Sequence, residues 1–314
     1  RVRSSAASDV YKRQPELEET EVYLQSMDFA HAWMLGLIPT EEIYRELMGR
    51  VNSPTRIKDI TSALDERNHS LFHSLTQKVV NRILEIELQR GDSETQVTRL
   101  AEELHRVYGA ETLIRILQAF GKDTFIRDSY NWRNTKRGVL SSLLHACYPS
   151  PDDDSDTLKS LASQADISHI RLVEAAMFAP QWLELTEKAT GWKGLESAAY
   201  YFHAHTSECF DDKKKAIIAR YTPIAIEDLQ EGAFDIDWFK EAYKTIGKER
   251  FEVVYNAAKY ISLSNTHTRA RKFADAVNGK TKAADAKKEI IAKRNKDLLM
   301  SYGLIPLGRK ADKE

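Results

Sequence analysis

Apolar residues recur at three- and four-residue spacing along almost the whole chain, as they do on one face of an α-helix. Three successive segments show this spacing and end at glycines that can take a positive φ after a helix: 72–91, 97–109 and 113–121. Glycine and proline are otherwise scarce, and no run of alternating β-branched residues is long enough for a sheet. The sequence therefore predicts an all-α protein with no significant β-sheet.

Further helices are predicted through the centre and the C-terminal part of the chain. Their expected bounds are 136–148, 157–164, 169–178, 180–190, 195–206, 212–220, 238–246, 249–262, 268–277 and 283–302. Ser53 before Pro54 and Ala179 before Pro180 are typical of helix starts. Because most connections are short, successive helices are expected to be antiparallel neighbours.

The segment 195–206 indicates how these helices are arranged. Leu195 and Phe202 lie on one side of the helix, and Tyr201 lies on the other. A helix that is apolar on both sides is sandwiched between neighbours. We therefore expect stacked helical hairpins in a HEAT-like α-solenoid or an elongated helical domain. No strict repeat period is present, so a globular helical domain remains an alternative.

Composition shifts divide the chain into five regions. These are a tail at 1–14, a helical region at 15–148, an acidic hinge at 149–156, a second helical region at 157–279 and a basic helix with a truncated end at 280–314. Back-translation of Ser4 to Gln14 resembles an adapter oligonucleotide of transposase-based sequencing libraries, so we expect 1–14 to be non-native. On this interpretation the chain is a piece of a longer protein.

The proposed hinge combines two prolines with the acidic run Asp152 to Asp156. Its alternate aspartates resemble the start of a calcium loop, but the glycine and glutamate that this loop needs at its sixth and twelfth positions are missing. We therefore expect a solvated loop in which Ser155 or Asp156 caps the next helix.

Overall composition narrows the class of protein. The chain is 42% hydrophobic and 30% charged with a formal net charge of −1, values typical of a globular protein rather than a polyanion binder. The longest nearly apolar run, Phe29 to Ile38, is about half the length needed to cross a bilayer. Cys147 and Cys209 form no paired motif, which favours a reduced, cytoplasmic protein.

One group of candidate residues lies in the central helices, where aromatic and histidine side chains gather. A ligand or partner surface is predicted from Trp182, Trp192, Tyr200, His203 and His205. His203 and His205 are about 200° apart on a helix and cannot bind one metal ion together, which favours packed histidines. No nucleotide, hydrolase or metalloprotease motif is present, so the sequence predicts no catalytic residue, metal or cofactor.

The loop Asn131 to Gly138 is a second candidate. Trp132, Arg133, Lys136 and Arg137 could stack on a base and hold a phosphate. Packing of Trp132 at a helix start explains the same residues.

Positive charge gathers beyond Thr266, where 13 Lys and Arg face 6 Asp and Glu. Candidate polyanion contacts there are Arg269, Arg271, Lys272, Lys287, Lys288 and Arg294. The helix expected at 283–302 has only a thin apolar stripe of Ala284, Ile291 and Leu298. We expect it to lie against something that this sequence does not include.

Segments 171–206, 219–247 and 257–279 resemble the large bacterial MolR-type proteins. These are described as molybdate metabolism regulators and are built from the domain-of-unknown-function families 5724 and 4132. The resemblance implies helical-repeat architecture and transfers no catalytic residue. Some relatives carry a WGR domain, which suggests a nucleic-acid context, but no such domain is visible here.

These observations favour a non-catalytic scaffold or protein-interaction region of a larger cytoplasmic bacterial protein. Its expected partners are other protein segments, including missing parts of its own chain, and no membrane. One alternative is a nucleic-acid-binding helical module that uses the basic C-terminal segment. Another is part of an enzyme whose active site lies outside this chain or around His203 and His205.

Overall fold

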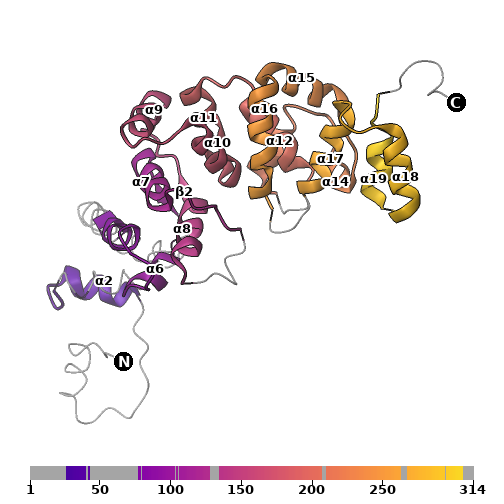
Figure 1. Cartoon of the computed structure of the whole chain (residues 1–314). Helices are drawn as coiled ribbons and strands as arrows, with labels where there is room; N and C mark the ends of the chain where they lie inside the picture. Colours follow the sequence, from indigo (N-terminus) through magenta and orange to yellow (C-terminus); the bar gives the residue numbers. More distant parts are fainter. Residues whose placement is uncertain are drawn as a thin grey trace, which may run out of the picture. The chain divides into compact units, whose positions relative to one another are not determined.

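The computed structural model describes residues 26–39, 42, 77–78, 80–102, 104, 106–127, 134–206, 210–262, 267–293 and 295–306 (Figure 1). The chain separates into two compact units, Arg1–Asn81 and Arg82–Glu314. In the first unit the structure describes the helix α2, Ser26–Met34, and the turn after it. The expected helix start at Ser53 and Pro54 lies outside the described residues.

The second unit is built from helices, which confirms the predicted helical fold. Residues 80–88 are helical and lead into this unit. Its α-helices are α6 Thr98–Glu102, α7 Ala110–Phe120, α8 Lys136–His145, α9 Ser155–Gln164, α10 His169–Phe178, α11 Leu183–Thr190, α12 Leu195–Ala204, α13 Asp212–Ile218, α14 Ile226–Glu231, α15 Ile236–Ile246, α16 Lys248–Ala257, α17 His267–Val277, α18 Ala283–Lys293 and α19 Lys296–Tyr302. Two 3-10 turns, η1 Pro180–Trp182 and η2 Ala258–Tyr260, extend α11 and α16.

Two short strands replace the ends of two predicted helices. β1, Val107–Tyr108, pairs in parallel with β2, Cys147–Tyr148. The helices predicted to continue through these residues were therefore too long. The physical reason is pairing between the two segments: the N–H of Val107 donates to the Ala146 carbonyl at 2.9 Å and the N–H of Gly109 donates to the Tyr148 carbonyl at 3.0 Å, so these groups are not bonded within a helix.

In the second unit, both consecutive helices and helices farther apart in the sequence pack together. α9 packs against both α7 and α11, and α10 packs against α11 and α16 (Figure 1). α12 lies in the middle of the C-terminal part and contacts α11, α15, α16 and α17. This packing is consistent with stacked hairpins, while the HEAT-like assignment stays a prediction.

The core is rich in aromatic side chains around α12. Every residue of this helix from Ala198 to Ala204 is buried, as its two apolar sides predict. Tyr201 contacts the rings of Phe239 and Trp238 on α15. Its hydroxyl donates to the Ala270 carbonyl of α17 at 2.9 Å, so one side chain joins three helices.

The acidic segment at 149–156 is a loop that is hydrogen-bonded to the rest of the second unit. Asp153 accepts from the backbone N–H of Ala110 and of Ser150, and so connects the loop to the start of α7. Asp154 caps α9 by accepting from the N–H of Thr157 at 2.7 Å. The expectation that Ser155 or Asp156 caps this helix was therefore wrong by one or two positions.

The C-terminal segment holds two helices where one was predicted. α18 ends at Lys293, and Asn295 begins α19 by accepting from the N–H of Leu298. α19 packs against α17 and α18. α14 was missed altogether, because its six residues are too short for a clear apolar period.

Candidate functional site

The aromatic and histidine candidates lie in the core of the second unit. All of them are 8% exposed or less: Trp182, Trp192, Tyr200, His203 and His205. Trp182 donates its indole N–H to the Cys147 carbonyl at 2.7 Å, which ties η1 to β2. These residues hold helices together and do not form a surface.

His203 and His205 lie in different surroundings, as their helical spacing predicts. His205 caps the end of α12, and its Nδ1 donates to the Tyr201 carbonyl at 2.7 Å. Burial lowers the pKa of His205 to about 4. Burial, with Lys214 and Arg127 nearby, holds the pKa of His203 well below its usual range. Both rings are therefore neutral at pH 7.

Cys147 is a buried structural thiol. Its side chain is fully buried in β2, and burial together with Asp153 raises its pKa far above the usual range. A thiol in this state is a poor nucleophile.

The basic candidates fall into two groups. Arg269 forms an ion pair with Asp297 at 2.8 Å and donates to the Gln230 carbonyl. Arg271 lies over the ring of Tyr255, 4.1 Å from its centroid. These two arginines are engaged in joining helices. Lys272 is half-buried, Lys287 and Lys288 are exposed, and Arg294 lies outside the described residues.

Among the described residues of the C-terminal part, the outward sides of α18 and α19 carry the most exposed large apolar side chains. We call the following residues the α18–α19 face: Ala284, Lys287, Lys288, Ile291, Lys296, Leu299 and Tyr302. Ile291 is 71% exposed and Leu299 is 60% exposed. α18 buries Ala286, about 140° around the helix from Ile291. The predicted stripe of Ala284, Ile291 and Leu298 is therefore split, because Leu298 alone of the three is buried.

Other side chains of α19 fix this helix to the rest of the unit. Asp297 binds Arg269 of α17, and Leu298 and Ser301 are buried. Met300 lies directly over Gly232, where any side chain would collide with its methyl group. These contacts determine which side of α19 faces outward.

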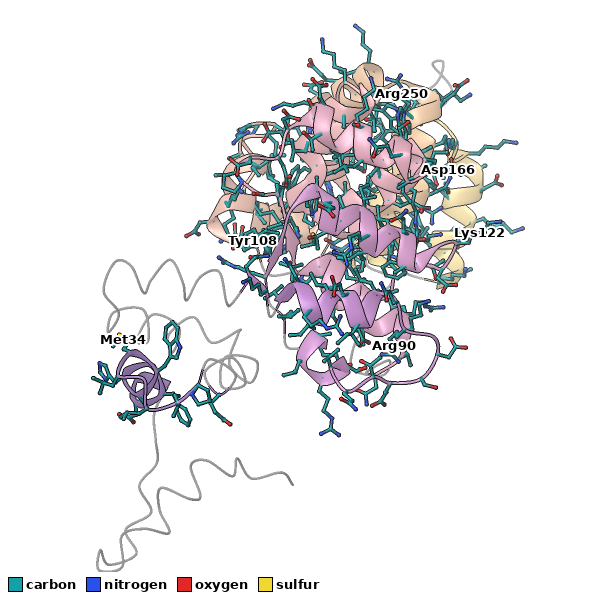
Figure 2. All side chains as sticks on the ribbon, turned by 90° about the vertical axis from the view of Figure 1, so that its left-hand side faces the viewer. Met34, Arg90, Tyr108, Lys122, Asp166 and Arg250 are labelled. Carbon is teal, nitrogen blue, oxygen red and sulfur yellow. The ribbon has the colours of Figure 1, made fainter. Side chains whose placement is uncertain are left out.

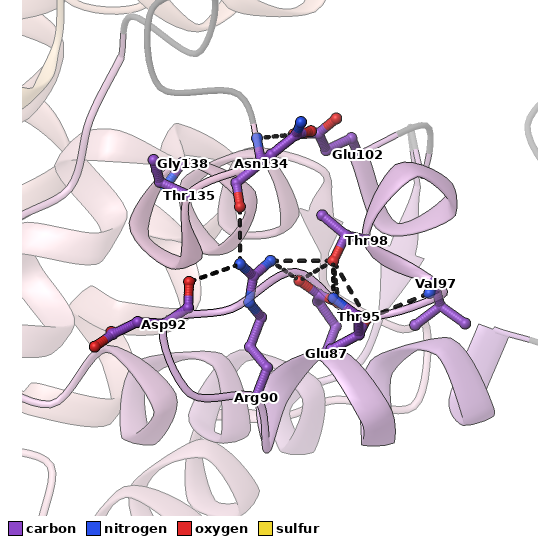
Figure 3. Close-up of polar contacts among 10 residues, drawn as sticks. All are labelled: Glu87, Arg90, Asp92, Thr95, Val97, Thr98, Glu102, Asn134, Thr135 and Gly138. Carbon is purple, nitrogen blue, oxygen red and sulfur yellow. Dashed lines mark hydrogen bonds and ion pairs between the residues drawn. The ribbon is translucent and has the colours of Figure 1, made fainter.

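A buried polar cluster surrounds Arg90, which is labelled in Figure 2 and drawn with its partners in Figure 3. Its guanidinium forms an ion pair with Glu87 and donates to the Thr98 hydroxyl, while both charged side chains are almost completely buried. It also donates to the carbonyl of Asn134 at 2.8 Å, and the N–H of Asn134 donates to Glu102 at 2.6 Å. Asn134 takes a φ of 67°, which is uncommon for a residue other than glycine.

An open pocket of about 550 Å³ lies beside this cluster at the start of α8. It is lined by Asp92, Glu94, Asp123, Asn134, Thr135, Lys136 and Arg137. Lys136 and Arg137 belong to the loop that the sequence marked, whereas Trp132 and Arg133 lie outside the described residues. The lining mixes three carboxylates with two cations.

A family model matches residues 4–314, which is nearly the whole chain. The chain belongs to the family of unknown function DUF5724. The match includes residues 4–14, the stretch interpreted as adapter-derived. The adapter interpretation and the MolR-type resemblance both stay predictions. No curated protein and no solved structure matches this DUF5724 chain.

Two further properties of the DUF5724 chain concern only the part that the structure describes. In that part, no group of three or more His, Cys, Asp or Glu side chains is placed to hold a metal ion. None of the helices there has the length and hydropathy needed to cross a membrane.

Sequence reasoning missed the Arg90 cluster. The spacing of Glu87 and Arg90 is typical of an exposed helical ion pair, and nothing local distinguishes it from one. The partners Asn134 and Glu102 come from distant segments, so only the folded chain brings them together.

Proposed function

We propose that this DUF5724 chain is a protein-interaction domain whose helical array holds a binding surface on α18 and α19. The observation that carries the proposal is the outward position of Ile291 and Leu299 on neighbouring helices. Covering an apolar side chain gains about 25 cal/mol per Å² removed from water. A partner that covers both residues therefore gains free energy that this chain alone leaves unused.

The resemblance of residues 171–279 to MolR-type proteins supports the same proposal, because it implies a helical-repeat array with no established catalytic residue. Arrays of this kind present long surfaces and gain binding energy from shape rather than from bond chemistry. In this proposal the chain acts as a scaffold within a larger protein.

Nucleic-acid binding by the C-terminal segment is the alternative that the charge excess raises. Arg269 and Arg271, the residue type best suited to phosphate, are engaged with Asp297 and Tyr255. The exposed apolar side chains of the α18–α19 face also have no role in binding phosphates. Protein binding accounts for both observations, so we favour it.

Site-specific photo-cross-linking tests the proposal. A benzophenone amino acid is placed at Ile291 and, as a matched control, at Ile170 of α10, which is 51% exposed. In cells that naturally produce the protein, we expect protein adducts of defined mass at position 291 and none at position 170. The adduct partner is then purified and its binding measured.

The affinity of the purified partner for variants of the chain then tests the proposal. We expect Ile291→Asp to weaken its affinity about tenfold or more, and Ile170→Asp to change it less than about twofold. Equal cross-linking at the two positions, or equal affinities of the two variants, contradicts the proposal.

A further inference from the structure

We infer that the α18–α19 face binds an acidic amphipathic helix of a partner protein. The inference rests on the protein-interaction function proposed above and adds the chemistry of the partner. It is carried by three properties of the face: its apolar residues, its lysines and its fixed position on the unit.

The apolar residues of the face have a spacing that matches the apolar side of a partner helix. Ala284 and Ile291 are seven residues apart on α18, which places them on one side about 10 Å apart along the axis. Leu299 and Tyr302 are three residues apart and share one side of α19. A partner helix with apolar residues at i, i+3 or i+4, and i+7 offers matching side chains.

The charges beside these residues are positive. Lys287 and Lys288 lie four and three residues before Ile291, and Lys296 lies three residues before Leu299, so each apolar anchor has lysines on its own side. None of the three lysines pairs with a carboxylate among the residues that the structure describes. Residues 267–306 contain ten Lys and Arg against four Asp and Glu. A partner with carboxylates around its apolar side complements this charge.

The face is presented by anchored helices. The ion pair of Arg269 with Asp297, the cap at Asn295 and the seat of Met300 on Gly232 hold α19 against α17 and α14. α18 packs in turn on α19. Since the outward side is already in place before binding, the partner bears most of the ordering cost.

A polyanion would use only part of this surface. Phosphates attract lysines but gain nothing from Ile291 and Leu299, which are the most exposed large aliphatic side chains among the described residues of the second unit. An acidic helix uses lysines and apolar residues together. The inference therefore commits to a protein partner and makes nucleic acid an outcome of the test.

The test uses the full chain and a synthetic probe. The probe is a fluorescein-labelled helical peptide of about five turns, with leucines at i, i+3, i+4 and i+7 and glutamates on both flanks. The first control peptide has the same composition with the leucines scrambled around the helix, and the second has lysines in place of glutamates. A DNA duplex of similar length is the third. Binding is measured by fluorescence anisotropy at low and physiological salt.

We expect the acidic amphipathic peptide to bind at least about tenfold more tightly than either control peptide. Ile291→Asp and Leu299→Asp should each weaken it about tenfold, while Ile170→Asp leaves it unchanged. Lys287→Glu with Lys288→Glu should weaken it and reduce its salt dependence. The matched charge control is Lys240→Glu with Lys244→Glu, two exposed lysines of α15. Thermal unfolding by circular dichroism verifies that each variant is folded.

Three outcomes would overturn the inference: no binding of the acidic peptide, equal binding of the scrambled peptide, or binding of DNA that depends on the lysines but not on Ile291. The cross-linking experiment separates this failure from failure of the proposed function. If adducts form at Ile291 and the acidic peptide does not compete with them, the chain is a protein-interaction domain for another kind of partner. If no adducts form there, both proposals fail.

Discussion

At the scale of single residues, Arg90 and Glu87 are two charged side chains that are almost completely buried, which costs hydration free energy. A charged side chain taken out of water is stable only when a partner and hydrogen bonds compensate for its lost hydration. Arg90 receives this compensation from Glu87 and Thr98, from the neighbouring carbonyl of Asp92 and from the distant carbonyl of Asn134. The pair therefore holds the segment before α8 in place, beside the polar pocket.

Arg90→Ala is expected to lower the free energy of unfolding by about 3 to 5 kcal/mol, because it leaves Glu87 buried without its partner. Urea unfolding monitored by circular dichroism measures this change. The control is Arg82→Ala, since Arg82 forms an exposed ion pair with Glu85 whose loss costs about 1 kcal/mol or less. Similar losses for the two variants would show that the buried pair is not required.

The buried histidines predict a loss of stability in acid. The folded-state pKa of His205, about 4, and that of His203 lie below the ordinary histidine pKa of 6.5. The unfolded chain therefore binds more protons as the pH falls below 6.5, and the free energy of unfolding decreases. The stability that comes from keeping these two histidines neutral is therefore fully present above pH 6.5.

Replacement of His205 by Gln should flatten this pH dependence between pH 6.5 and 4 by up to about 1.4 kcal/mol per pH unit. Unfolding midpoints measured across that range test it. His169→Gln, at the exposed start of α10, is the control. An unchanged slope in the His205 variant would refute the assignment.

At the scale of elements, glycines decide how closely helices approach. Gly194 begins α12 with a φ of 85°, and a side chain there would lie 2.8 Å from Cγ2 of Thr245 at the end of α15. Gly191, at the end of α11, has a φ of 67° with open space around it. From the helix ends alone, a side chain would be expected to destabilise the protein by a similar amount at either position. The contact with Thr245 makes the loss of stability larger at Gly194.

Gly194→Ala is expected to destabilise the protein by more than Gly191→Ala, for which a positive φ alone costs about 1 to 2 kcal/mol. Adding Thr245→Ala to the Gly194 variant should recover part of the excess, because it removes the colliding Cγ2 methyl group and leaves the Cβ at 3.1 Å. Thermal unfolding of the three variants measures these differences. Equal midpoints for the two single variants would show that the collision relaxes without cost.

At the scale of the whole molecule, the second unit contains the helices on both sides of the acidic segment 149–156. The contact of α9 with α7 and the hydrogen bond from the Trp182 indole to the Cys147 carbonyl connect residues on the two sides of that segment. We therefore predict that residues 82–314 unfold in one cooperative transition.

Urea unfolding of this fragment, followed by tryptophan fluorescence and by far-ultraviolet circular dichroism, tests the prediction. Coincident curves are expected for one transition. Two separated transitions would instead indicate that 149–156 divides two independent regions, as the composition of the sequence suggests.

The sequence by itself determined the helical class, most helix positions and the buried state of α12, because a 3.6-residue apolar period is a local property. It also located Ile291 on a thin stripe with no evident partner. The ends of helices were less predictable. β1 and β2 stop two helices through pairing between segments about 40 residues apart, which no local pattern contains.

Only the tertiary structure decided which side chains are available for binding. It placed Trp182, His203 and His205 in the core, engaged Arg269 with Asp297, and left Ile291 and Leu299 outside. It also brought Arg90 to Asn134. The physical reason is that exposure and ion pairing depend on neighbours distant in the chain, so the same residue types are buried in one place and exposed in another.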